Sequence, residues 1–253
     1  ERIAPDAGKL EQVVRILLDE ATQRGVDQAE AAASHDVGLS VTARLGDVEN
    51  LEYTNDRGVG VTVYVKSCKG SASTSDFSEP ALREAVAKAC SFAASTAADK
   101  HSGLADAELM AKDPADLKLA YPWDLDAEQA IRLAIECETA ARDFDTRISN
   151  SEGATVGSSN GVRAYGNTHG FLASSRKTSH SLSCVVVGQT DGEMQRDYWY
   201  STSRNHAALE SAAAVGRTAA ERTVNRLGAR KIATTRAPVL FAPELARGFI
   251  GHA

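Results

Sequence analysis

Hydrophobic residues recur three and four positions apart in four stretches of the chain, and this spacing predicts four amphipathic helices. Gly25 suits the end of the first helix. Ser78 suits the cap of the second, where Pro80 falls in the first turn and removes no needed hydrogen bond. The predicted helices cover residues 9–24, 78–93, 126–142 and 206–227.

A second pattern, strict alternation of apolar and polar residues, predicts half-buried strands. It is clearest at 38–45 and 59–65, with a return strand at 48–53 between them. Turn residues punctuate this region and the β-rich stretch at 147–200, which we read as several short strands. The predicted turns include 46–47, 55–58, Asn160-Gly161, Gly166-Asn167 and Asp191-Gly192.

These elements predict an α+β fold in which helices pack on mostly antiparallel sheets. The order is helix, four strands, helix, and then the same again, so the two α/β halves could be a duplicated architecture. We divide the chain into regions 1–112 and 113–234. Residues 235–253, with a short strand at 238–241 and a helix from Pro243, are expected to begin a C-terminal domain that is truncated here.

Composition narrows the function classes. The chain has 253 residues and a formal net charge of -6. No basic run stands out that would follow a phosphate backbone, so nucleic-acid binding is disfavoured. Uninterrupted apolar stretches fall short of the roughly 18 residues that a membrane span needs, so we expect no membrane insertion.

Candidate chemistry is sparse in the sequence. The six histidines include no pair at the spacing of a zinc-binding helix. His169 and His180 lie in one strand-rich region, and as metal ligands they would need a third partner. A structural role is the favoured alternative for both. Gly157-Ser158-Ser159-Asn160-Gly161 is read as a hairpin turn rather than a serine nucleophile site.

The four cysteines are far apart and form no C-x-x-C pair. We expect reduced core thiols, since Cys90 and Cys137 fall on apolar helix faces. Zinc ligation or a disulfide stays an alternative. Tyr198-Trp199-Tyr200 is an aromatic cluster on a strand, for which packing is favoured over ligand binding.

Several stretches taken together resemble the TldD/PmbA family, and specifically its PmbA (TldE) branch. Their order and spacing match across nearly the whole chain. The matching stretches are Gly46-Asp47-Val48-Glu49-Asn50-Leu51-Glu52, Gly58-Val59-Gly60-Val61-Thr62-Val63-Tyr64, Lys69-Gly70-Ser71-Ala72-Ser73, Arg147-Ile148-Ser149-Asn150-Ser151-Glu152-Gly153, Gly166-Asn167-Thr168-His169-Gly170-Phe171, His180-Ser181-Leu182-Ser183, Asp191-Gly192-Glu193-Met194-Gln195-Arg196-Asp197-Tyr198, Arg226-Leu227-Gly228-Ala229-Arg230-Lys231-Ile232 and Ala237-Pro238-Val239-Leu240-Phe241-Ala242.

The resemblance implies a cytoplasmic bacterial peptidase built as a heterodimer of two related subunits. The TldD-like subunit carries an H-E-x-x-x-H helix and a distant cysteine that hold a metal, expected to be zinc. The PmbA-like subunit lacks that motif. The pair encloses a chamber in which an extended, unfolded peptide is cut. Family names also mention modulation of DNA gyrase and peptide maturation.

The decisive positions for this chain are Gly251 and His252, which match the first His and the Glu of the metal-bearing branch. Glycine cannot ligate a metal, and histidine cannot replace the carboxylate base. A shift of one residue would place Ala253 at the Glu position, and the chemistry fails there too. The resemblance therefore implies a non-catalytic partner subunit, with no catalytic, metal or cofactor site of its own.

Two alternatives stay open. The chain could belong to an active metalloprotease whose ligands lie mostly beyond Ala253, with His252 contributing. It could also be a peptide-binding regulatory protein that works without a TldD-like subunit. Whether it forms a homodimer when that subunit is absent is a further open point.

Overall fold

The structure, a computed structural model, describes residues 6–112 and 114–252. Five α-helices, six strands and two 3-10 turns are assigned within these residues. In chain order they are α1 (Ala7–Gln23), β1 (Gln28–Arg44), β2 (Asp47–Val65), β3 (Cys68–Thr74), α2 (Glu79–Ser95), η1 (Ala107–Leu109), α3 (Ala127–Arg142), β4 (Ile148–Asn167), β5 (Leu172–Thr190), β6 (Glu193–Ser203), η2 (His206–Ala208), α4 (Ala212–Asn225) and α5 (Pro243–Ile250).

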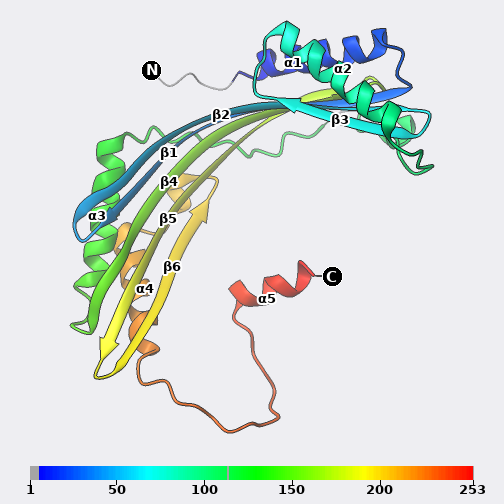
Figure 1. The fold of residues 1–253 in the computed structure, drawn as a ribbon. Helices are drawn as coiled ribbons and strands as arrows, with labels where there is room; N and C mark the ends of the chain where they lie inside the picture. The colour runs from blue at the N-terminus through cyan, green and yellow to red at the C-terminus, as the bar shows by residue number, and fades with distance from the viewer. Residues whose placement is uncertain (1–5, 113, 253) are drawn as a thin grey trace.

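The strands form one antiparallel sheet in the order β3-β2-β1-β4-β5-β6. Its centre is the long pairing of β1 with β4, which runs from Glu30 opposite Asn167 to Ala43 opposite Ala154. On either side of this pairing the chain repeats the same unit: a helix, three strands and a second helix. The sheet bends into an arch, with α1 and α2 over one end and α3 and α4 over the other (Figure 1).

The two faces of the arch differ in the polarity of their side chains. Along β1, Ala29, Ala31, Leu39 and Val41 are buried on the convex face beneath the helices. Successive residues of a strand point to opposite faces, so the intervening positions line the concave face. In β1 these are mostly small or polar residues: Gln28, Glu30, Ala32, Ser34, Asp36, Gly38, Ser40 and Thr42.

Each helix pair covers its own hydrophobic cluster. The first cluster includes Leu10, Leu17 and Leu82, and the second includes Val41 and Val215. A buried carboxylate ties the second cluster to the sheet: Glu138 of α3 accepts hydrogen bonds from the backbone N–H groups of Leu45 and Gly46, at 2.7 and 2.8 Å. Glu138 thereby fixes the β1–β2 turn against α3.

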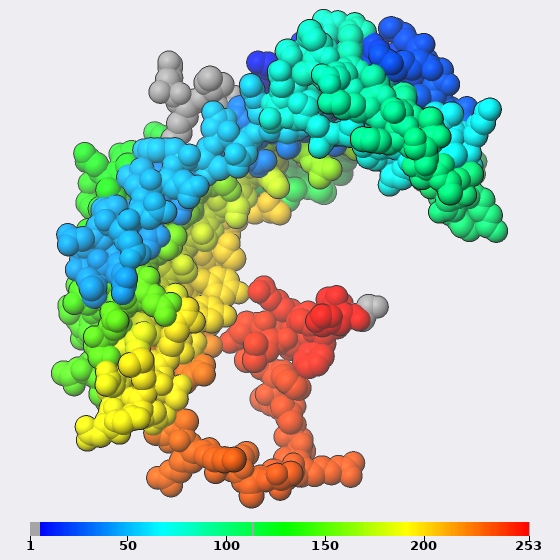
Figure 2. Space-filling view, in the orientation of Figure 1, coloured from blue at the N-terminus to red at the C-terminus, as the bar shows by residue number. Residues whose placement is uncertain are grey.

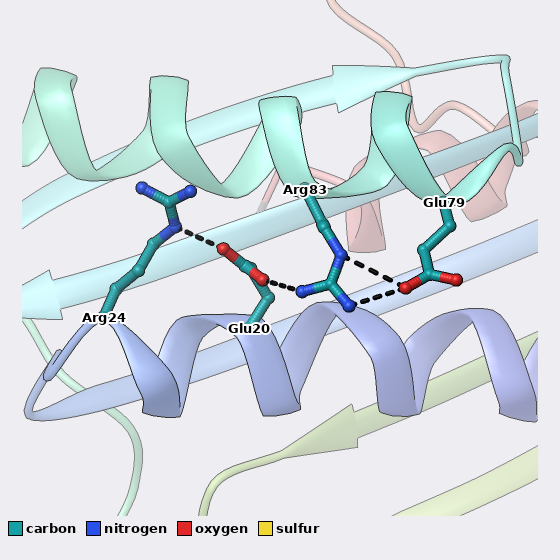
Figure 3. Close-up of polar contacts among 4 residues, drawn as sticks. All are labelled: Glu20, Arg24, Glu79 and Arg83. Carbon is teal, nitrogen blue, oxygen red and sulfur yellow. Dashed lines mark hydrogen bonds and ion pairs between the residues drawn. The ribbon is translucent and has the colours of Figure 1, made fainter.

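An ion-pair chain joins α1 to α2 (Figure 3). The Glu20 carboxylate accepts from Arg24 Nε at 2.7 Å and from Arg83, which also lies 2.6 Å from Glu79. The pKa of Glu20 lies below its ordinary value of 4.5: burial alone would raise it, but the hydrogen bonds and charges of Arg24 and Arg83 outweigh burial. Because the folded pKa is lowered, this link stabilises the pair fully above pH 4.5 and weakens as acid protonates Glu20.

The predicted α+β class, the antiparallel pairing and the helices are confirmed, with one helix shortened. The predicted helix at 206–227 begins instead at Ala212, after the turn η2. The division into regions 1–112, 113–234 and 235–253 stays a prediction. The two helix layers are separate, but the sheet is shared.

The strand predictions were wrong in the number of strands, since each half has three rather than the four expected, and in three further places. The predicted turn at 55–58 lies inside β2, and the predicted Asn160-Gly161 hairpin lies inside β4. Both stretches pair along their length with β1, so their glycines are strand residues of the concave face rather than turn residues. Residues 238–241 form no strand, because no strand of the described chain pairs with them.

Helix packing gives a prediction for Gly216 of α4. A Cβ at this position would lie 2.0 Å from the backbone oxygen of Cys137 in α3. We expect Gly216→Ala to force the helices apart and to lower the free energy of unfolding by about 2 kcal/mol. Denaturant unfolding measures this change.

Gly248 of α5 provides the matched control. It is also helical, but a Cβ there meets no atom within 4 Å. Because alanine forms helix better than glycine, Gly248→Ala should cause no loss of stability. Equal stability of the two variants would contradict the proposed close contact between α3 and α4.

Candidate functional site

The concave face has a glycine-rich floor. Five glycines occupy concave positions of the three central strands: Gly38, Gly58, Gly60, Gly157 and Gly161. None of the five has a positive φ, so backbone conformation does not require glycine there. At Gly58 an added Cβ would meet nothing within 4 Å, and at Gly60 it would meet one oxygen at 3.9 Å. Packing does not require these two glycines either, and their absent side chains leave the backbone accessible from the concave side.

A hollow of about 580 Å³ lies on this floor. Small residues of β1, β2 and β3 form its base, and its charged lining comes from Asp36, Arg163 and Lys177. The Asp36 carboxylate lies over Gly161, where an added Cβ would be 2.0 Å from Asp36 Oδ1 and 3.5 Å from Lys177 Cε. The hollow thus combines exposed strand backbone with groups of both charges.

Hydroxyl groups extend this polar surface along the arch. Thr42 and Thr155 bond to each other across β1 and β4 at 2.9 Å, and Thr62 bonds to Ser71 across β2 and β3 at 3.0 Å. Figure 2 shows the hollow side of the arch facing the C-terminal segment, drawn in red. The face offers hydrogen-bond donors and acceptors along the arch.

One end of the concave face is closed by a buried polar cluster. Glu30 accepts hydrogen bonds from the hydroxyls of Tyr64 and Tyr165, each at 2.9 Å. Burial, and then the Glu30 carboxylate, raises the pKa of Tyr64 to about 12. The segment 99–110 crosses this end, with the Leu104 N–H donating to Gln28 at 2.9 Å.

The other end carries the aromatic cluster. Tyr198 and Tyr200 stack on the concave side with ring centroids 6.2 Å apart. Trp199 points to the opposite face, where the Arg222 guanidinium lies 5.1 Å from its ring. The packing role predicted for this cluster therefore applies to Trp199, whereas the two tyrosines line the open concave face.

The structure does not bring His169 and His180 together. His169 lies in the β4–β5 turn near Gln28, at 3.4 Å. His180 is buried on the convex side, where its Nδ1 lies 3.0 Å from Ser158 Oγ and its Nε2 lies 3.0 Å from the Tyr121 carbonyl oxygen. These partners agree with the structural role favoured from the sequence for His180.

His180 also contributes to an aromatic stack. Trp123 packs edge-on against His180 and face-on against His206, with centroid distances of 5.4 and 5.0 Å. This stack fastens the segment before α3 to β5.

Cys137 and Cys184 are buried free thiols, and their mutual contact and burial raise the pKa of Cys137. Cys68 and Cys90 are half-buried and also free.

The positions that we expect to match the family His-Glu lie at the exposed end of α5. Gly251 caps the helix and His252 follows it. Gly248 and Phe249 lie one helical turn earlier, on the same side of the helix, and neither can ligate a metal. In the described residues no group of three His, Cys, Asp or Glu side chains is placed to hold a metal ion. Ala253, the Glu position in the shifted register, lies outside the described residues.

Helix α5 lies on the concave side of the arch (Figure 1). Its Glu244 is 3.2 Å from Arg222 of α4. It exposes several large apolar side chains: Leu245, Phe249 and Ile250.

In the described part of the chain, no helix is both long and apolar enough to cross a membrane.

Family models match the two halves of this fold. The model of the PmbA/TldA metallopeptidase domain 1 matches residues 29–93, and that of the PmbA/TldA metallopeptidase central domain matches residues 120–227. The chain belongs to the PmbA/TldD metallopeptidase family, in its PmbA (TldE) branch.

Two relatives share more than two fifths of their aligned residues with the chain. It is 43% identical over 244 residues to the metalloprotease PmbA homolog of Haemophilus influenzae, covering 96% of this chain and 54% of the relative. It is 42% identical over 243 residues to metalloprotease PmbA of Escherichia coli O157:H7, with the same coverage of each. The chain thus spans about half the length of the curated relatives it matches.

Solved structures share the fold. A Bacteroides thetaiotaomicron protein, whose crystal structure is named for modulation of DNA gyrase, superposes with a TM-score of 0.81 at 22% identity, over 88% of this chain and 51% of that one. TldE from Thermococcus kodakarensis superposes with a TM-score of 0.62 at 13% identity, over 85% and 47%. At these identities the likeness shows the fold alone.

Sequence reasoning missed the concave site. Glu30 falls in the first ten residues of β1, outside the strand predicted at 38–45, so its cross-strand neighbours Tyr64 and Tyr165 could not be identified. Alternation of Glu30, Ala32, Ser34 and Asp36 with Ala31, Ala33 and His35 was the available signal. It was weak because alanine does not distinguish a buried strand face from a helix.

The Glu30 cluster gives a pH prediction. Since the folded pKa of Tyr64 is near 12 and its ordinary value is 10, the folded state holds this proton more tightly. The contribution to stability is complete below pH 10 and is lost as pH rises towards 12. Glu30→Gln removes the neighbouring negative charge and should shift the late phase of an absorbance titration of tyrosinate to lower pH.

Tyr64→Phe is the assigning control, since it should remove the Tyr64 part of that late phase and leave any part due to Tyr165, whose pKa is also raised by burial. Circular dichroism recorded at each pH confirms that the fold persists during the titration. An unchanged late phase in Glu30→Gln, in protein that stays folded, would contradict the role given to the carboxylate.

Proposed function

We propose that this chain is part of the PmbA-like, non-catalytic subunit of a cytoplasmic two-subunit metallopeptidase. In this proposal a TldD-like partner holds the zinc ion and performs the hydrolysis. The proposal rests on the pair Gly251 and His252, which the family resemblance aligns with the imidazole ligand and the carboxylate base of the metal-bearing branch. Neither residue can do the required chemistry.

The concave face supports a role in holding the substrate. An extended peptide presents backbone N–H and C=O groups along its whole length, whatever its sequence. The floor around Gly58 and Gly60 offers exposed backbone, and the serines and threonines beside it offer hydroxyls. Such a surface favours an unfolded polypeptide of varied sequence over a compact ligand, which would need an enclosed pocket.

A second candidate, an active metalloprotease, is favoured by the names of the relatives and by the presence of His252. Its remaining ligands would lie outside the described residues. The two candidates differ in what they require of His252, which is exposed at the end of α5.

The test uses the full-length protein, alone and mixed with its TldD-like partner. Metal analysis of the isolated protein should find no stoichiometric zinc, and the isolated protein should leave unfolded peptides intact. In the mixture, peptide cleavage should appear, and His252→Ala should keep it within about twofold, because an imidazole that neither ligates nor transfers protons contributes little to the barrier.

One tightly bound zinc ion per isolated chain would overturn the proposal. So would a loss of about a thousandfold or more in cleavage on His252→Ala, which is the size expected for removal of a ligand or base. Phe249→Ala, at the neighbouring exposed position, controls for damage to α5 itself.

A further inference from the structure

Charge on the concave face is separated across the sheet. One row of directly opposite residues runs from β2 through β1 and β4 to β5: Asp56, Asp36, Gly161 and Lys177. The row begins with two carboxylates and ends with an ammonium group. Arg163 lies two residues along β4 from Gly161 and therefore on the same face. The acidic groups thus lie towards β2 and the basic groups towards β5.

Gly161 is the point at which the two signs of charge meet. The Asp36 carboxylate and the end of the Lys177 side chain lie so close above it that an added Cβ would touch both. Lys177 and Arg163 nevertheless take part in none of the ion pairs among the described residues. Both side chains are exposed at the hollow. Two cations are therefore available there to a negatively charged group.

A second hollow continues the positive lining beyond Arg163. It has a volume of about 870 Å³ and extends over the first half of β5. Among the described residues that line the two hollows, four are cationic and two are acidic: Lys118, Arg163, Arg176 and Lys177 against Asp36 and Asp116. The whole chain has a formal net charge of -6, so this surface is positive against the balance of the protein.

We propose that Arg163 and Lys177 form a subsite for an acidic side chain, glutamate or aspartate, of an extended polypeptide lying on the concave face. The carboxylate would lie between the guanidinium and ammonium groups. Asp36 would repel it from the β1 side. The inference rests on the part of the proposed function that places an unfolded peptide on this face, and it adds a preference for acidic sequence to contacts made with the backbone.

The register of the strands places this subsite within reach of the glycine floor. Arg163 lies opposite Ser34, and Ser34 lies opposite Gly58. Arg163 is thus two strand spacings, about 10 Å, from Gly58, a distance that an arginine and a glutamate side chain span together. A nucleic-acid strand is the less favourable occupant, because the carboxylates of Asp36 and Asp56 would face its phosphates.

The test measures peptide binding to the isolated full-length protein. The probes are peptides of about eight residues, the length of an ordinary strand, blocked at both ends. One alternates glutamate with serine, and its match carries glutamine in place of glutamate. The glutamate peptide should bind about fivefold more tightly, and added salt should reduce this preference. Equal affinity for the two peptides would overturn the proposal.

Paired substitutions assign the preference to the two cations. Arg163→Gln with Lys177→Gln should abolish it, and Arg163→Glu with Lys177→Glu should transfer it to a lysine–serine peptide. Lys88→Gln with Arg217→Gln removes the same charges from exposed positions of α2 and α4 and should leave the preference intact. Equal effects of the two glutamine double variants would show general attraction instead of a subsite.

Two further probes test the other occupants. They are a glutamine–serine peptide with a free C-terminal carboxylate and a single-stranded oligonucleotide of similar length. Either probe overturns the proposal if it binds more tightly than the blocked glutamate peptide and loses that affinity in Arg163→Gln with Lys177→Gln.

Cleavage by the complex with the TldD-like partner separates this proposal from the proposed function. If the complex cleaves neither peptide while the isolated protein keeps its preference, the peptidase role fails and the acidic subsite stands. If the complex cleaves both peptides and the isolated protein binds them equally, the subsite fails and the peptidase role stands.

Discussion

The difference in polarity between the two faces of the sheet is the constraint on which the rest of the structure depends. Buried aliphatic residues such as Leu39 and Val41 fill the space beneath the helices. Along the middle of the sheet many of the opposite positions carry glycine, alanine, serine or threonine, so the sheet can bend towards that side without crowding its side chains. The bend places both helix pairs on the convex side and leaves an uncovered, polar concave face (Figure 1).

The same asymmetry connects the fold to the proposed role. Packing does not require glycine at positions 58 and 60. The glycines there are explained if a bound molecule must come close to the backbone. In the proposed function, this chain contributes to the metallopeptidase by shaping the chamber and contacting the substrate. Contacts made through the backbone and hydroxyl groups of the concave face would suit a substrate that is recognised by its extended form.

The helices could be predicted from the sequence because their apolar stripes repeat over several turns, as in α1 and α3. The long strands could not. Gly58 and Gly161 were read as turn residues, since glycine most often marks a change of direction, and only tertiary pairing reveals that they continue a strand. The positions of Gly251 and His252 came from the family resemblance. The Glu30–Tyr64–Tyr165 cluster needs three strands in register, which no local pattern specifies.

The most direct measurement fills the concave floor without disturbing the fold. Gly58→Val with Gly60→Val adds two β-branched side chains where no atom lies closer than 3.9 Å to the new Cβ positions, so the free energy of unfolding should be kept or raised. In the full-length protein assembled with its TldD-like partner, cleavage of an unfolded peptide should fall about tenfold or more, because the side chains keep the substrate from the backbone. Unchanged cleavage by an equally stable complex would contradict the account.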